Sequence, residues 1–161
     1  MGKVKVIFGS TTGNTESAAQ QIAAALGTEA VNIASATAAD FDADLLVLGS
    51  STWGVGDLQD DWAAGIARLE KADLKGRKVA VFGEGDQDGF SDTYCDAMGI
   101  LAEKAVSRGA ELIGQTSAAG YRFSGSSAVK DGQFCGLALD DNNEPDKTSG
   151  RIAAWVELLK K

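Results

Sequence analysis

The sequence predicts a single doubly wound α/β domain, in which helices cover both faces of a parallel β-sheet. Strand-like and helix-like runs alternate along all 161 residues, and such alternation implies parallel pairing through right-handed crossovers. The run Leu45–Leu48 is continuously apolar, which is typical of a strand covered on both faces. No repeat or linker-like composition divides the chain, so residues 1–161 are expected to form one domain.

Five short runs carry the apolar pattern of strands. They are Lys3–Phe8, Glu29–Asn32, Leu45–Leu48, Lys78–Phe82 and Glu111–Gln115. The region Thr116–Leu137 is rich in Gly and Ser, so it is interpreted as an insertion that interrupts the last strand. The segment Phe134–Leu139 is expected to resume that strand.

Four longer runs have the residue spacing of helices. They are Thr15–Leu26, Asp57–Leu69, Thr93–Arg108 and Thr148–Leu159. Trp62 and Trp155 fall on the apolar stripes of two of these helices. Both tryptophans are therefore expected in the core and not in a binding site.

The chain has a formal net charge of −8 and contains no histidine. The absence of histidine removes the side chain best suited to acid–base chemistry near neutral pH, and also the commonest metal ligand. No catalytic residue and no metal site are therefore expected. An acidic surface disfavours nucleic acid and anionic membranes, and it attracts basic protein partners.

The sequence contains neither a secretory signal pattern nor an apolar run of membrane-spanning length. Its two cysteines, Cys95 and Cys135, cannot make a disulfide framework. They are interpreted as small buried residues in the reduced state. A cytoplasmic location is the expectation that fits these observations.

Doubly wound sheets bind ligands outside the carboxyl ends of their strands, so the loops after Phe8, Leu48 and Phe82 are the informative ones. The first loop is rich in hydroxyl groups and runs straight into a helix. Its candidate binding residues are Ser10, Thr11, Thr12, Gly13, Asn14 and Thr15. Helix amino termini with nearby hydroxyls suit a phosphate group, and the loop lacks the lysine of a Walker motif. Ordinary helix capping by Ser and Thr is the alternative.

The second loop, after the third strand, places a tryptophan between glycine-rich segments. Its candidate residues are Ser51, Thr52, Trp53, Gly54, Val55 and Gly56. Trp53 is suited to stacking on a flat ligand, and Gly54 permits close approach of the backbone to that ligand. A surface loop with an incidental tryptophan is the alternative interpretation.

The third loop, after the fourth strand, combines carboxylates, glycines and an aromatic residue. Its candidate residues are Glu84, Gly85, Asp86, Phe90, Asp92 and Thr93. Phe90 could cover the second face of a planar ring. The loop does not match the ligand pattern of a calcium loop or of a zinc site, so its carboxylates are not assigned to a metal.

Together these three loops resemble the flavodoxin family. Ser10–Thr15 matches the family's phosphate signature, while Thr52–Gly56 and Gly83–Gln87 look like its two flavin-ring loops. The region from Tyr121 onward looks like the insertion of the long-chain subgroup. The resemblance implies a five-stranded sheet of order 2-1-3-4-5 and one non-covalently bound flavin mononucleotide (FMN).

The resemblance also implies roles for individual residues. The first loop would hold the phosphate, Trp53 would stack on the inner face of the flavin ring, and backbone groups of both ring loops would bind its edges. The family usually has tyrosine on the outer face. Here Phe90 matches that position, and Tyr94 is a competing candidate. Asn142 stands where some members carry aspartate near the ring, and its role is left open.

The function implied is low-potential electron transfer between a basic NAD(P)H-dependent reductase and electron-accepting enzymes, by a monomer that is not an enzyme. Glu84, Asp86 and Asp92 are expected to disfavour the reduced flavin anion electrostatically. A peptide flip at Gly54–Val55 is expected to favour a neutral blue semiquinone. A flavin-dependent quinone or NAD(P)H oxidoreductase of the same fold is the alternative. A response-regulator-like module would need acidic residues where Gly9-Ser10 and Gly49-Ser50 stand.

Overall fold

The main sheet is parallel and confirms the predicted strand order. The computed structural model describes residues 3–9, 13–53, 57, 58 and 60–160. The central path of the sheet runs β2–β1–β3–β5–β10, which is the order 2-1-3-4-5 when these five strands are counted along the chain. The strands are β1 (Val4–Gly9), β2 (Ala30–Asn32), β3 (Leu45–Trp53), β5 (Lys78–Glu84) and β10 (Leu137–Leu139).

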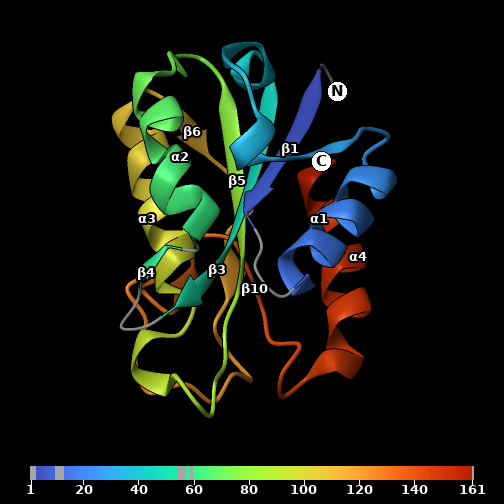
Figure 1. The fold of residues 1–161 in the computed structure, drawn as a ribbon. Helices are drawn as coiled ribbons and strands as arrows, with labels where there is room; N and C mark the ends of the chain where they lie inside the picture. Colours follow the sequence, from blue (N-terminus) through green and yellow to red (C-terminus); the bar gives the residue numbers. More distant parts are fainter. Residues whose placement is uncertain (1–2, 10–12, 54–56, 59, 161) are drawn as a thin grey trace.

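Two helices cover each face of this sheet (Figure 1). One pair is α1 (Asn14–Ala25) and α4 (Thr148–Leu159), and the other pair is α2 (Asp60–Lys71) and α3 (Asp96–Ser107). Side chains alternate between the faces of a strand. In β5, Val79 and Val81 therefore join the core beneath α2 and α3, while Ala80 and Phe82 join the core beneath α1 and α4. No helix in the described ranges is both long enough and apolar enough to span a membrane.

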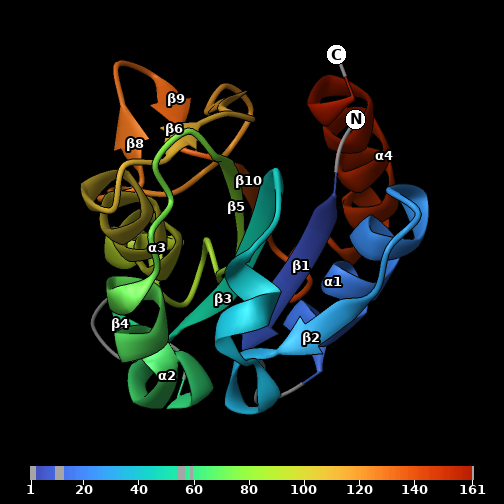
Figure 2. The same cartoon turned by 90° about the horizontal axis from the view of Figure 1, so that it is seen from above.

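The fifth strand of the sheet is split by the insertion, as the sequence predicts. The short strand β6 (Glu111–Leu112) pairs with the start of β5, and β10 pairs with its end. Between them lies a small antiparallel sheet in the order β7–β9–β8, at the edge beyond β10 (Figure 2). Its strands are β7 (Thr116–Ser117), β8 (Val129–Lys130) and β9 (Gln133–Phe134).

The strand prediction for Phe134–Leu139 is wrong at its start. Phe134 pairs with Thr116 and Val129 in the small sheet, and the main sheet resumes only at Leu137. Gly136 separates the two regions, and a Cβ atom placed on it would lie 1.8 Å from the carbonyl oxygen of Val81. The chain can therefore pass this close to β5 only with glycine at that position.

Two helices begin later than the sequence predicts. Asp57–Leu58 forms the short strand β4, which pairs antiparallel with the end of β3, and α2 starts at Asp60. Ser91–Thr93 forms the 3₁₀ turn η3. Helix α3 starts at Asp96, after Cys95 adopts a left-handed φ of 54°. The remaining 3₁₀ turns are η1 (Ile33–Ser35), η2 (Ala38–Phe41) and η4 (Pro145–Lys147). The tryptophan predictions are confirmed, because Trp62 and Trp155 are buried.

Candidate functional site

A polar pocket lies at the carboxyl edge of the sheet, where the sequence predicts a ligand. It encloses about 100 Å³ among the described residues. The residues that line it come from the start of α1, the ends of β3 and β5, and the segment after β10. They are Asn14, Ser51, Thr52, Glu84, Gly85, Asp86, Phe90, Asp141 and Asn142. The register brings these ends together, since Glu84 lies opposite Ser51 on one side and Leu139 on the other.

Seven of the predicted site residues therefore line one pocket, and the others, Trp53 apart, divide into two groups. Some are described but do not line it: Gly13, Thr15, Asp92 and Thr93. The rest lie outside the described residues: Ser10, Thr11, Thr12, Gly54, Val55 and Gly56. Trp53 ends β3, and its stacking on the ring stays a prediction.

Helix α1 points its amino terminus at the pocket through Asn14. Gly13 precedes it in the left-handed region, with a φ of 94°, a backbone conformation that favours glycine. The backbone N–H of Ser17 donates to the carbonyl oxygen of Gly13 at 2.9 Å. The amino terminus of a helix attracts anions, so this corner of the pocket suits a phosphate.

The end of β3 is fastened to the opposite helix layer. The Oγ1 atom of Thr52 accepts a hydrogen bond of 3.0 Å from the backbone N–H of Ala97, in the first turn of α3. This contact satisfies one of the N–H groups that a helix amino terminus leaves without an intrahelical partner. Thr52 thus positions its loop by capping α3, in addition to lining the pocket.

Asp86 organises the loop that follows β5. Its Oδ1 atom accepts hydrogen bonds from the backbone N–H of Gly89 at 2.7 Å and from Asn143 Nδ2 at 2.7 Å. Asn142 Nδ2 donates to its other oxygen at 3.3 Å. The Gly89 N–H, followed by the Asn143 amide, lowers the pKa of Asp86, because these bonds favour the charged form. Asp86 is therefore a negative charge at the pocket, and Asn142 serves to hold it.

A buried network behind this loop joins it to two other segments. Gln87 donates from its backbone N–H and from Nε2 to Asp140 Oδ2, at 3.0 and 2.9 Å, and also from Nε2 to Glu144 at 2.7 Å. The carbonyl oxygen of its side chain accepts from the backbone N–H of Arg122 at 2.6 Å, in the insertion. Hydrogen bonds from Lys147 and then from Gln87 lower the pKa of Glu144 to about 2. Sequence reasoning missed this network.

Glu84 differs from the other carboxylates of the site. Its side chain is buried, and neither oxygen accepts a hydrogen bond from a donor group. Burial and then a hydrogen bond with the carboxyl of Asp141 raise the pKa of Glu84 to about 10, because both disfavour the charged form. The surroundings of Glu84 therefore favour its neutral form, in contrast to those of Asp86.

The two aromatic candidates for the outer ring face occupy different environments. Phe90 is 48% exposed and lines the pocket. Tyr94 is fully buried and stacks on Phe123 with ring centroids 5.4 Å apart. A Cβ atom on Gly85 would lie 2.8 Å from the Tyr94 ring, so Tyr94 supports the loop from inside. Only Phe90 of the two is available to cover a ligand.

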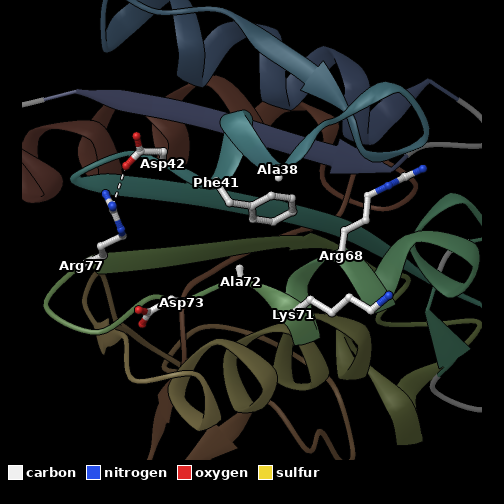
Figure 3. Close-up of a pocket in the computed structure, with 8 residues that line it drawn as sticks. All are labelled: Ala38, Phe41, Asp42, Arg68, Lys71, Ala72, Asp73 and Arg77. Carbon is white, nitrogen blue, oxygen red and sulfur yellow. Dashed lines mark hydrogen bonds and ion pairs between the residues drawn. The ribbon is translucent and has the colours of Figure 1, made fainter.

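A second and larger hollow lies at the opposite, amino edge of the sheet (Figure 3). It encloses about 430 Å³ between η2, the end of α2 and the start of β5. Phe41 lies at its centre, with Arg77 paired to Asp42 on one side and Arg68 and Lys71 on the other. Arg77 also donates to the carbonyl oxygen of Ala43 at 2.9 Å, and Arg68 donates to that of Ile33 at 2.6 Å. Both arginines thus hold loops of the fold in place.

Fold and site together define the class: a doubly wound α/β protein with a polar ligand pocket at the carboxyl edge of its sheet. A family model for flavodoxins matches residues 6–155. A flavodoxin from Picosynechococcus is 46% identical over 99% of this chain and 97% of its own length, and one from Helicobacter pylori is 38% identical over 99% and 98%. The chain belongs to the flavodoxin family.

A solved structure agrees with this assignment. The crystal structure of Fusobacterium nucleatum flavodoxin bound to flavin mononucleotide matches with a TM-score of 0.94 and 28% identity, over 99% of this chain and 98% of that one. Flavodoxins are electron carriers and not enzymes, so this chain is an electron-transfer protein.

Proposed function

We propose that this protein carries electrons on one FMN, bound non-covalently in the pocket at the carboxyl edge of the sheet. The observation that carries the proposal is the convergence of a helix amino terminus at Asn14, the end of β3 at Thr52 and the exposed ring of Phe90 on one pocket. The F. nucleatum flavodoxin, with the same fold, binds flavin mononucleotide.

The described residues fit this cofactor. The amino terminus of α1 suits the phosphate, and Ser10, Thr11 and Thr12 are proposed to complete its site. Phe90 offers a flat apolar face to one side of the ring, and Trp53 is proposed to cover the other side. The backbone of Gly85 and Asp86, which line the pocket, supplies groups for the polar edges of the flavin.

FMN supplies the redox chemistry when bound, and the chain supplies binding, orientation and electrostatics. Stacked aromatic rings exclude water from the ring faces. The charge of Asp86, fixed by Gly89 and Asn143, opposes the addition of further negative charge nearby. The site is therefore suited to an electron carrier that works at low potential.

The partners are proposed to be basic redox proteins, namely NAD(P)H-dependent reductases and electron-accepting enzymes. The net charge of −8 supports this, because opposite charge steers the encounter of two proteins. Transfer rates to a reductase should fall as ionic strength rises, and rates independent of salt would contradict steering. A single domain, a monomeric state and a cytoplasmic location are part of the same proposal.

The first experiment is an absorption spectrum of the purified protein during stepwise reduction, with FMN released and quantified afterwards. The proposal expects a yellow protein with one FMN per chain, which does not oxidise NAD(P)H without an added reductase. A protein that binds no added FMN would contradict it. Direct NAD(P)H oxidation would favour a flavin-dependent oxidoreductase instead.

A further inference from the structure

Glu84 occupies a central position at the floor of the pocket. It is the last residue of β5, between Ser51 of β3 and Leu139 of β10. Alternation along β5 places it on the same face as Ala80 and Phe82, which pack beneath α1 and α4. Glu84 therefore faces the side of the sheet that α1 and α4 cover.

The Glu84 carboxyl is 5% exposed, lines the pocket, and accepts no hydrogen bond on either oxygen. Its side-chain neighbour at hydrogen-bonding range is the carboxyl of Asp141. Within the described residues, Glu84 has no ion pair with a lysine or arginine. A buried carboxylate without such partners is strongly disfavoured, whereas the protonated acid is much less costly to bury. The position of Glu84 therefore favours a protonated carboxyl.

The titratable groups around Glu84 act in the same direction. They are Asp141 and Asp140 after β10 and Cys95 before α3. Asp141 accepts a hydrogen bond from the hydroxyl of Thr148, and Asp140 accepts from Gln87 and Asn143. All of these neighbours are acidic. A second negative charge in their midst is unfavourable, and the proton is therefore retained on Glu84.

A protonated carboxyl is a hydrogen-bond donor, which an ionised carboxylate is not. FMN offers mainly oxygen acceptors on its phosphate and ribityl groups. We infer that Glu84 holds a proton in the cofactor site and donates a hydrogen bond to an oxygen of bound FMN, instead of placing a negative charge beside it. This inference rests on the proposed binding of FMN at this pocket.

The first test needs no cofactor. Carbon-13 NMR of FMN-free protein with labelled glutamate follows the Glu84 carboxyl as pH changes, and the E84Q variant identifies its signal. We expect the signal of a protonated acid up to about pH 8. Titration near the ordinary pKa of glutamate would overturn the inference. FMN does not enter this measurement, so its outcome is independent of the proposed function.

The second test measures FMN dissociation constants at neutral pH for wild type, E84Q and E84L. Glutamine keeps a neutral donor at this position, so its affinity should stay within about threefold of wild type, while leucine should lose about tenfold. Equal affinities for all three proteins would overturn the hydrogen bond. If wild type binds no FMN, the proposed function has failed, and the NMR titration still decides the protonation of Glu84.

The third test distinguishes a donor from a charge through the midpoint potentials of bound FMN. Removing a charge beside the flavin makes it easier to reduce, so E84Q should leave the potentials unchanged if Glu84 is neutral. D92N is the matched control, because it removes an exposed carboxylate of the same loop, and it should shift the potentials in the positive direction. A positive shift in E84Q larger than that in D92N would overturn the inference.

Discussion

The two hollows of this molecule lie at opposite edges of one sheet and differ in what surrounds them. The amino-edge hollow is about four times larger, at 430 against 100 Å³. Its arginines are already bonded to backbone carbonyls and to Asp42. The carboxyl-edge pocket holds a helix amino terminus, an exposed aromatic ring and a buried carboxyl that accepts no hydrogen bond. Size alone favours the amino-edge hollow as the ligand site. The polar groups that the protein itself does not satisfy favour the carboxyl-edge pocket.

This comparison indicates that a ligand site is recognised by polar groups whose hydrogen bonds the protein itself does not complete. At the amino edge, Arg68 joins α2 to η1, and Arg77 joins the segment before β5 to the segment before β3. At the carboxyl edge, parallel strands end together and leave polar groups of separate loops facing the same space. Substitutions at the carboxyl edge should therefore change ligand affinity, whereas substitutions at the amino edge should change folding stability and leave affinity nearly unchanged.

The largest effect is expected at Gly85. In G85V, the added side chain would meet the buried ring of Tyr94, since even a Cβ atom would lie 2.8 Å from it. The end of β5 must then shift, and such overpacking costs about 3 kcal/mol of folding stability. Because the shifted backbone lines the pocket, FMN should also bind about a hundredfold more weakly. Quenching of FMN fluorescence measures the affinity. Unchanged binding would show that the end of β5 does not position the cofactor.

The next effect concerns the stability of the FMN-free protein as a function of pH. The pKa of Glu84 is raised to about 10 in the folded state, from 4.5, so its favourable contribution is complete below pH 4.5 and is lost as pH rises towards 10. E84Q has no such loss. Relative to wild type, the variant should therefore gain ~2 kcal/mol of unfolding free energy between pH 5 and pH 6.5, as measured by urea unfolding. A stability difference that is independent of pH would contradict the protonation of Glu84.

A smaller effect is expected at Phe90, whose ring is exposed in the pocket. F90A removes a stacking surface worth about 1.4 kcal/mol, so FMN should bind about tenfold more weakly. F90Y is the matched control, because it keeps the ring and should bind within about twofold of wild type. Equal losses in both variants would show that the ring does not cover the flavin.

The smallest effect on the ligand is expected at the amino edge. R77A removes the hydrogen bond to Ala43 and the ion pair with Asp42, which should lower the unfolding free energy by ~1 kcal/mol. FMN affinity should stay within about twofold of wild type, since Arg77 lies at the far end of the sheet. A marked change in affinity would mean that the two edges are energetically coupled.

Local patterns in the sequence were sufficient for the strands and for the position of the site, whereas the strand order followed from the resemblance to the flavodoxin family. Apolar runs identify the strands, and loops at their carboxyl ends carry the ligand chemistry. Helix starts were less predictable. The strand β4 depends on pairing with β3, and the late start of α3 depends on the left-handed backbone of Cys95. Neither leaves a periodic signal.

The contributions of Asp141 and Gln87 could not be predicted either. Asp141 reaches the pocket only because β10 pairs beside β5, across a long insertion. Gln87 stands in a loop that resembles a ligand site, yet its side chain binds Asp140, Glu144 and Arg122. The sequence also gives no sign that Glu84 differs from an ordinary loop carboxylate, because its protonation depends on burial and on the neighbouring Asp141. Such properties depend on burial and on neighbours distant in the chain.

The Gln87 network has a consequence for local unfolding. One side chain joins the loop after β5 to the backbone N–H of Arg122 in the insertion and to Glu144 before α4. Opening any of these three segments breaks bonds to the others, so they should open as one cooperative unit. When a ligand is held at the pocket, amide hydrogen exchange should then slow at Arg122, which is distant in sequence from the loops after β1 and β3. The insertion thus reports on the occupancy of a site that it does not line.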